Sequence, residues 1–386
     1  MLSPANENEL SEAIAGAKGP LHVVGGGTRS IGIVTSGEVL SVSGLAGIEL
    51  YDPGALTLVA KAGTPLAEIE VALAAEGQML PFEPADMRAL LGREGVSTIG
   101  GVVAANTSGP RRMMAGACRD SLIGVRFVDG RGEVLKNGGR VMKNVTGYDL
   151  VKLMAGSYGT LGVLSEVAFR VLPKLGGATL IVRAVGGVQA LEVMTRAITS
   201  PFEVSGAAAV PGEGAFLRLE GLDTSVTYRT GKLSALLGGF GEIDVISDAA
   251  ASAALWARLR DVTDFADGSS AVWRVSMKPS DLSGRLVPVL GGELDVQYDW
   301  AGGLGWLRLR DGAGDAEIVA MHRMIQTGVA THGGGHATLF KAPVAVLRQV
   351  SVFQPEAPGV SMLTRGLRAK FDPMGMLNPG LMGGVA

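Results

Sequence analysis

A glycine loop near the start of the chain has the composition of an anion-binding site. Residues 23–30 read VVGGGTRS, and consecutive backbone N–H groups in a loop without Cβ atoms can hydrogen-bond several pyrophosphate oxygens without cationic side chains. The candidate phosphate ligands are Gly25, Gly26, Gly27, Thr28, Arg29 and Ser30. A tight turn between two strands would have the same composition, because 58 of the 386 residues are glycine and about one Gly-Gly-Gly triplet is expected by chance.

Two later segments also consist of small residues that could approach a bound dinucleotide. Residues 97–106, STIGGVVAAN, predict the start of a helix whose first turn faces a phosphate or a ring system. Residues 147–163 predict a short helix, a glycine turn and a strand in sequence. The candidate ligands are Ser97, Thr98, Gly100, Gly101, Ala104, Gly162 and Val163. Close packing of a helix on a sheet is the alternative for the first segment. Each helical glycine costs roughly 1 kcal/mol relative to alanine, and close packing would offset that cost.

Helices and strands are mixed in the first 175 residues. Strands are predicted over residues 21–24, 31–34, 39–44, 56–60 and 161–171. Helices are predicted after the cap residue Asn8 and after Thr64 and Pro65, which form an N-cap and N1 pair. Apolar and polar residues alternate within 161–171, which indicates a half-buried strand. The glycine loop lacks the third glycine of G-x-G-x-x-G and no helix pattern follows it, so a Rossmann domain is disfavoured.

The character of the chain changes after residue 175. The runs TLIVRAV, AFLRLEG, VWRVSM and GLGWLRLR lie between amphipathic helices and predict a second α+β domain with an antiparallel sheet. The last stretch begins as a basic helix and ends in turns at Asp372-Pro373 and Asn378-Pro379. We therefore predict domains over residues 1–175 and 176–345 and a C-terminal segment over residues 346–386.

Composition excludes several classes of function. A net charge of −3 and a pI near 5.9 give no broad positive field, so nucleic acid is not an expected partner. The N-terminal residues show no secretory signal, and no apolar run approaches the roughly 18 residues of a membrane span. We expect a cytoplasmic protein that reaches a membrane only through partners. Cys118, the single cysteine, can form neither an intrachain disulfide nor an iron–sulfur cluster by itself.

The three glycine-bearing segments, in this order, resemble the FAD-binding domain of the vanillyl-alcohol oxidase-like (PCMH-type) flavoenzymes. Within that superfamily the chain is similar to the FAD-binding E-type subunits of glycolate oxidases. Residues 371–380, FDPMGMLNPG, are similar to the C-terminal signature of the glycolate oxidase and D-lactate dehydrogenase branch. The resemblance implies an α+β fold in which a two-part PCMH-type FAD-binding domain precedes an α+β cap domain with an antiparallel sheet, and the C-terminal segment returns to the FAD domain.

The resemblance also implies an activity. An FAD-dependent oxidoreductase complex of this kind, a glycolate dehydrogenase, converts glycolate to glyoxylate and passes electrons to an acceptor other than nicotinamide. The implied partners are a homologous catalytic FAD subunit and an iron–sulfur subunit. Covalently linked flavoenzymes commonly carry a histidine in or beside the first glycine loop, where this chain has Thr28, so we expect noncovalent FAD. A self-sufficient FAD-dependent 2-hydroxy acid dehydrogenase of the D-lactate type and a structural subunit without redox chemistry remain alternatives.

Catalytic residues are not assigned by the sequence, because the histidine-rich, acidic GDGN-type motif of the catalytic relatives is absent. A 2-hydroxy acid needs a cation for its carboxylate and a base for its hydroxyl proton. Arg308, Lys341 and His336 are candidates, although nothing in the sequence shows that they converge. His332 and His336 lie four residues apart, but three glycines separate them, so we expect no helical metal site there.

Overall fold

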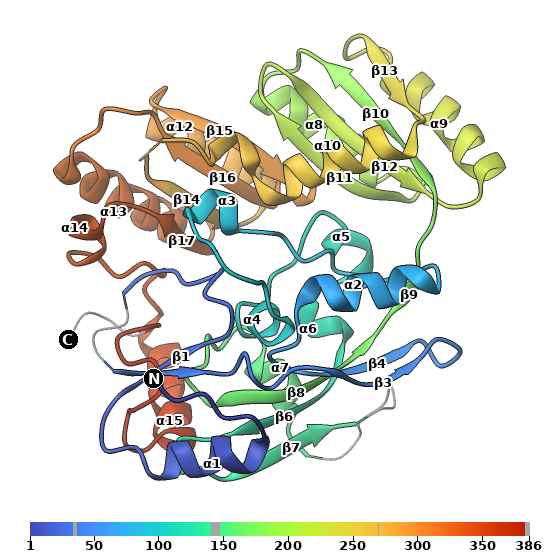
Figure 1. Ribbon diagram of the computed structural model, residues 1–386. Coiled ribbons are helices and arrows are strands. Elements are labelled where there is room, and N and C mark those ends of the chain that lie inside the picture. The colour runs from blue at the N-terminus through green and yellow to red at the C-terminus, as the bar shows by residue number, and fades with distance from the viewer. Residues whose placement is uncertain (34–36, 140–146, 269, 383–386) are drawn as a thin grey trace.

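Two sheets of different size organise the chain, a smaller one in the N-terminal part and a larger one in the part that follows (Figure 1). The structure is a computed structural model and describes residues 1–33, 37–139, 147–268 and 270–382. The end of the strand predicted over 31–34 and the start of the loop that leads to Gly147 lie outside these residues.

The N-terminal part contains an antiparallel sheet with the strand order β3-β4-β8-β6-β7. Its strands are β3 (Ile48–Asp52), β4 (Thr57–Lys61), β6 (Leu122–Val128), β7 (Val134–Gly138) and β8 (Val163–Arg170). Two strand pairs accompany it, the parallel pair β1 (Leu21–Val24) and β2 (Glu38–Ser41) and the antiparallel pair β5 (Gln78–Met79) and β9 (Leu172–Pro173). The helices are α1 (Glu7–Ala15), α2 (Leu66–Ala75), α3 (Arg88–Leu91), α4 (Ile99–Ala104), α5 (Arg112–Ala115), α6 (Cys118–Ser121) and α7 (Leu150–Met154).

The central strand β8 differs from its prediction as a half-buried strand. Its residues are almost all buried, because the sheet is covered on both faces. Val163 packs with Leu10 and Ile14 of α1 in one apolar cluster, whereas Val167 and Phe169 belong to the cluster that includes the buried side of α2. Glu166 and Arg170, which alternate with the apolar residues in the sequence, are therefore half-buried and do not form a face exposed to water.

Three local predictions in this part are wrong. Asn6 rather than Asn8 caps α1, and its side chain accepts a hydrogen bond from the Glu9 N–H at 3.0 Å. Thr64 does not cap α2, because its hydroxyl bonds to the carbonyl of Lys61 at 2.7 Å. Residues 31–33 are not a strand.

The second part is built on one antiparallel sheet with the strand order β13-β10-β12-β11-β15-β16-β14-β17, as the strand-like runs predicted. Its strands are β10 (Gly177–Arg183), β11 (Val204–Val210), β12 (Gly214–Glu220), β13 (Ile243–Ile246), β14 (Val272–Ser276), β15 (Leu294–Asp299), β16 (Leu304–Leu309) and β17 (His336–Lys341). The main helices are α8 (Gly187–Ile198), α9 (Asp223–Leu237), α10 (Ala249–Asp261), α12 (Val287–Leu290), α13 (Asp315–Thr331) and α14 (Val344–Leu347). Among the described residues, no helix is both long and apolar enough to cross a membrane.

The C-terminal residues lie against the N-terminal part. Val350 and Val352 still pack in the core of the larger sheet, and α15 (Pro358–Phe371) follows them. The last residue of this helix, Phe371, packs on Phe127 of β6 with the ring centroids 6.0 Å apart. The Leu21 N–H then donates to the Met376 carbonyl at 2.8 Å, and Leu377 is buried in the cluster that contains α1. One edge of the N-terminal part is thus formed by the last residues of the chain.

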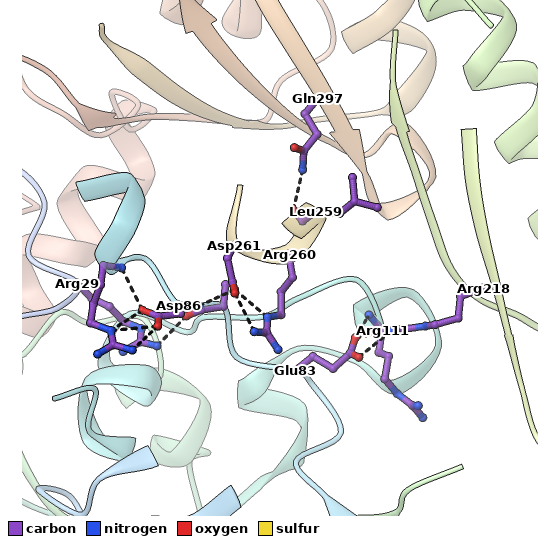
Figure 2. Close-up of polar contacts among 11 residues, drawn as sticks. Arg29, Glu83, Asp86, Arg111, Arg218, Leu259, Arg260, Asp261 and Gln297 are labelled. Carbon is purple, nitrogen blue, oxygen red and sulfur yellow. Dashed lines mark hydrogen bonds and ion pairs between the residues drawn. The ribbon is translucent and has the colours of Figure 1, made fainter. Parts of the chain in front are cut away.

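Buried ion pairs join the two parts. The Arg218 guanidinium of β12 donates two hydrogen bonds of 2.8 Å to the Glu83 carboxylate of the N-terminal part (Figure 2). A second pair has its arginine in the N-terminal part: Arg111 donates to the Glu220 carboxylate of β12 at 2.6 Å. These four side chains are each at most 15% exposed, so the charges are shielded from water and depend on one another.

Candidate functional site

A cavity of about 380 Å³ lies where the three glycine-bearing segments of the N-terminal part meet. Its walls include every predicted ligand except one: Gly25, Gly26, Gly27, Thr28, Arg29, Ser30, Thr98, Gly100, Gly101, Ala104, Gly162 and Val163. Ser97 is the exception, because its hydroxyl accepts a hydrogen bond from the Arg29 guanidinium and does not line the cavity. The structure therefore brings together segments that are more than 130 residues apart in the sequence.

The glycine loop needs its glycines because it passes close to residues 96–98. A Cβ on Gly26 would lie 1.5 Å from the Val96 carbonyl oxygen, and one on Gly25 would lie 2.4 Å from Thr98 Oγ1. Gly27 has φ +69° and meets no protein atom on its open side, which faces the cavity. Close approach of two backbones, rather than a tight turn alone, thus accounts for the loop.

Arg29 is a buried cation on the cavity wall. It donates to the Ala85 carbonyl at 2.7 Å and to Ser97 Oγ, while its Nε is buried without a hydrogen-bond partner among the described residues. Burial lowers the pKa of Arg29 to about 10, so the guanidinium stays charged at neutral pH. An orphaned N–H and a positive charge beside the glycine loop both fit an anionic ligand.

The α4 helix begins at the cavity. Thr98 is its N-cap and accepts a hydrogen bond from the Gly101 N–H at 3.3 Å. Gly100 packs on the sheet, since a Cβ there would lie 2.7 Å from both the Cβ and the carbonyl oxygen of Ala62. Gly100 thus permits close packing, while Gly101 and Ala104 line the cavity, and the contact of this segment with a ligand stays a prediction.

Asn378 completes the cavity from the C-terminal end of the chain. Its side-chain oxygen accepts a hydrogen bond from the Val23 N–H at 2.8 Å, and its amide nitrogen donates to the Tyr158 carbonyl at 2.8 Å. The residue is 4% exposed and connects the strand that leads into the glycine loop with the turn before β8. The turn signal at Asn378-Pro379 indicated this residue, but its partners are 355 and 220 residues away in sequence.

Replacing Asn378 with alanine is expected to weaken cofactor binding. Asn378→Ala leaves the Val23 N–H and the Tyr158 carbonyl without partners, which costs about 1–3 kcal/mol per buried group. Cofactor affinity, measured by titration of the apoprotein, should fall about tenfold or more, since the same hydrogen bonds position two walls of the cavity. Asn6→Ala is the control, because it removes a helix cap worth about 1 kcal/mol on α1 and should leave the affinity unchanged. Equal affinities for the two variants would contradict this role.

Other polar groups on the cavity wall carried no sequence signal. His22 of β1 and Arg93 line the cavity together with Tyr158, whose φ is +51°. Burial lowers the pKa of His22, which keeps the imidazole neutral at pH 7.

The residues proposed for a 2-hydroxy acid do not converge. Arg308 binds Asp295 at 2.6 Å, and Lys341 donates to the Ala266 carbonyl at 2.9 Å. His336 is exposed at the opposite end of the strand from Lys341 and lines neither this cavity nor its neighbour. Within the described ranges, no group of three or more His, Cys, Asp or Glu side chains could hold a metal ion. Cys118 is buried, and burial raises the pKa of its thiol, so it is not a nucleophile.

A second, smaller cavity of about 60 Å³ adjoins the first and shares Arg29, Ala105 and Tyr158 with it. Its other walls come from both parts of the chain, and those from the second part include Asp299 at the end of β15. Burial raises the pKa of Asp299 from 3.8 to about 7, although the Trp300 N–H and the charges of Arg218 and Arg274 oppose this shift. A carboxyl group therefore titrates near neutral pH between the two parts.

Asp299 makes stability depend on pH. The folded protein holds this proton more tightly than the unfolded chain, so the stabilisation is complete below about pH 4 and is lost as the pH rises to about 7. Asp299→Asn keeps the acceptor for the Trp300 N–H but carries no charge. We expect the variant to be more stable than the wild type near pH 8, by on the order of a few kcal/mol, and to lose this advantage near pH 4. Thermal unfolding at both pH values tests this, and a pH-independent difference would contradict it.

The sequence and structure were compared with known proteins. Residues 1–138 match the family model described as FAD binding domain. The chain is 35% identical to the glycolate oxidase subunit GlcE of Escherichia coli strain K12 over 382 residues, which are 98% of this chain and 97% of that protein. The chain belongs to the GlcE family. Its cofactor is FAD, and the predicted fold class, a PCMH-type FAD-binding fold with an α+β cap, is confirmed.

Two further comparisons extend the GlcE-family assignment. The glycolate oxidase subunit GlcD of Bacillus subtilis strain 168 is 31% identical over 180 residues, which are 45% of this chain and 37% of that protein. A solved structure of alkyldihydroxyacetonephosphate synthase superposes with a TM-score of 0.72 over 98% of this chain and 76% of the other, at 14% identity. The second likeness shows a shared fold only.

Proposed function

We propose that this chain is the FAD-binding subunit of a complex that oxidises glycolate to glyoxylate and passes the electrons to an acceptor other than nicotinamide. The observation that carries the proposal is the 380 Å³ cavity, whose glycine loop fits against residues 96–98 only because Gly25 and Gly26 lack a Cβ. The similarity to GlcE over nearly the full length of both chains supplies the substrate class.

In this proposal, the cavity holds FAD noncovalently. The backbone N–H groups of residues 25–30 bind the pyrophosphate, and the buried charge of Arg29 offsets its negative charge. Thr98, Gly101 and Ala104 form one wall against the cofactor, Gly162 and Val163 form another, and Ser97 acts through Arg29. FAD supplies hydride acceptance when bound, and the protein orients it and excludes water. Acid precipitation that releases the flavin into solution would support noncovalent attachment.

We propose two partners for the complex, a homologous FAD subunit that carries the catalytic motif and an iron–sulfur subunit. The names of GlcE and GlcD support an assembly of several subunits, and the single cysteine of this chain means that cluster ligands must come from elsewhere. The complex would be cytoplasmic, with membrane contact only through a partner. Residues 1–175 would form the FAD domain, 176–345 the cap, and 346–386 the segment that returns to the FAD domain.

A self-sufficient 2-hydroxy acid dehydrogenase is the second candidate. The smaller cavity favours it, because this space adjoins the proposed FAD site and contains unused charged groups. An anaerobic visible spectrum of the purified chain, recorded before and after glycolate and again with the partner subunits, separates the two. A flavin that bleaches only with partners supports the accessory subunit, bleaching of the isolated chain supports the second candidate, and the absence of flavin refutes both.

A further inference from the structure

Arg274 is a partly buried cation that no carboxylate of the described residues approaches within ion-pairing distance. It lies in the middle of β14, where its guanidinium is 4.9 Å from the ring centroid of Trp300 and 6.0 Å from that of Trp306. In the described part of the chain it forms no hydrogen bond or ion pair. Burial lowers its pKa to about 10, so it is a cation at neutral pH.

Other buried arginines at the boundary between the two parts have partners. Arg218 binds Glu83 with two hydrogen bonds of 2.8 Å, and Arg111 binds Glu220 at 2.6 Å. A desolvated guanidinium is costly unless an anion or several acceptors compensate it. Aromatic rings supply only part of that compensation. Asp299 lines the same cavity and its charge favours the Arg274 cation, but no carboxylate of the described residues lies within 4.0 Å of the guanidinium. The five donors of Arg274 are therefore available to a further anion.

The space beside Arg274 is the small cavity that adjoins the proposed FAD site. Arg274 lines this cavity, and its other polar groups are largely engaged with the protein. Arg260 forms hydrogen bonds with Asp261 at 2.8 and 2.9 Å, and Ser108 Oγ accepts the Cys118 N–H at 3.0 Å. Arg29 also lines the cavity, but it donates to the Ala85 carbonyl and to Ser97 Oγ and keeps only its Nε without a partner. Among the described residues that line the cavity, Arg274 is thus the cation whose donors are all unused.

The cavity limits the size of that ligand. Its volume of about 60 Å³ suits a small anion. Trp306 and Phe340 line one side, and their rings meet edge to face with the centroids 5.0 Å apart. Leu304 and Met87 add apolar walls. A longer acid would need to displace these side chains, which are packed in one buried cluster with Trp300.

We propose that Arg274 binds the carboxylate of a two- or three-carbon 2-hydroxy acid in this cavity, with Phe340 and Trp306 limiting the chain length. The inference rests on the proposed function, because it places this anion next to the FAD site at Tyr158 and Ala105. A guanidinium can bind a carboxylate through two parallel N–H···O bonds, and such pairs are strong where water is excluded. The chain would then bind acid by itself, whether or not it turns over without partners.

The test uses the full FAD-loaded chain and oxalate, a two-carbon dicarboxylate that is not oxidised by hydride removal. Binding is measured by calorimetry and by perturbation of the flavin spectrum. Arg274→Met should weaken oxalate binding at least thirtyfold, which is the order expected for removing one member of a buried charge pair. Arg310→Met is the matched control, because Arg310 directly follows β16, the neighbour of β14, but is 58% exposed and paired with Asp295. It should bind oxalate as the wild type does.

A second variant tests the size limit and does not depend on Arg274. Phe340→Ala should retain oxalate binding and improve the binding of 2-hydroxyglutarate about tenfold or more, because the cavity is then longer. Unchanged oxalate affinity in Arg274→Met, or no oxalate binding by a wild-type chain that holds FAD, would overturn the inference and leave the proposed function intact. A wild-type chain that cannot be loaded with FAD would overturn the proposed function itself.

Discussion

Gly26→Val is expected to purify without FAD. A valine at this position adds a side chain to the phosphate loop, and it also collides with the neighbouring backbone. Its Cβ would lie 1.5 Å from the carbonyl oxygen of Val96 and 2.6 Å from its carbonyl carbon. Backbone atoms cannot move aside as a flexible side chain can, so the loop and residues 96–98 must separate. The loop lines the 380 Å³ cavity, and Thr98 at the end of the second segment lines it too. We expect at least a tenfold loss of flavin occupancy, measured as the ratio of visible to protein absorbance after gentle purification.

The control for this prediction is a glycine of similar type outside the site. Gly239 lies in the second part of the chain, where a Cβ would meet no atom within 4 Å, so Gly239→Val should retain FAD. Both variants should keep the circular dichroism of the folded cap, because the large sheet has its own buried core. Full flavin occupancy in Gly26→Val would refute the placement of the phosphate site in residues 25–30.

Glu83→Gln should destabilise the protein by about 3–5 kcal/mol, the range for breaking a buried ion pair. Glu220 lies 3.5 Å from Arg218 Nε, but it is already paired with Arg111 at 2.6 Å and cannot replace Glu83 fully. Glu83 receives two hydrogen bonds from Arg218 and one from the Arg111 N–H at 2.9 Å, and its side chain is 15% exposed. A neutral amide cannot compensate the Arg218 charge, and one of its two former acceptor positions becomes a donor that faces the guanidinium. Urea unfolding of the wild type and the variant measures the difference.

An exposed ion pair provides the comparison for Glu83. Glu49 and Lys61 are 2.9 Å apart, and their side chains are 41% and 42% exposed. Glu49→Gln should change the free energy of unfolding by about 1 kcal/mol or less, because water screens the charges and replaces the contact. Similar losses in the two variants would mean that the Glu83 network contributes no more than a surface pair. Combining Glu83→Gln with Arg218→Met should restore part of the lost stability, since no unpaired charge then remains.

The sequence predicts the parts of this molecule that depend on local pattern. The strands β10, β12, β14 and β16 follow from short apolar runs, and the glycine segments follow from residues that must lack a Cβ. The start of α1 was placed two residues too late, because Asn6 and Asn8 both match a cap and only the fold shows which side chain receives the Glu9 N–H. Local rules therefore identify elements better than their ends.

The parts of the site that depend on distant contacts could not be predicted. Asn378 joins residues from the first and middle parts of the chain, and no periodicity signals such a contact. Arg274 sits in a strand where alternating charges usually face water, yet the adjoining part of the protein covers it. Ser97 fits a phosphate contact by its type, but the structure turns its hydroxyl to Arg29.

The hydrogen bonds of Asn378 impose an order on biosynthesis. Val23 leaves the ribosome early, but its partner is translated 355 residues later, after the entire second sheet. A nascent chain can fold the small sheet and pack α1 on it, yet it lacks the side chain that fastens the glycine loop to the turn at Tyr158. We therefore expect tight FAD binding only after Asn378 has been translated, and a ribosome-stalled or truncated chain that ends before Asn378 should be a poor flavin acceptor even if most of its fold has formed.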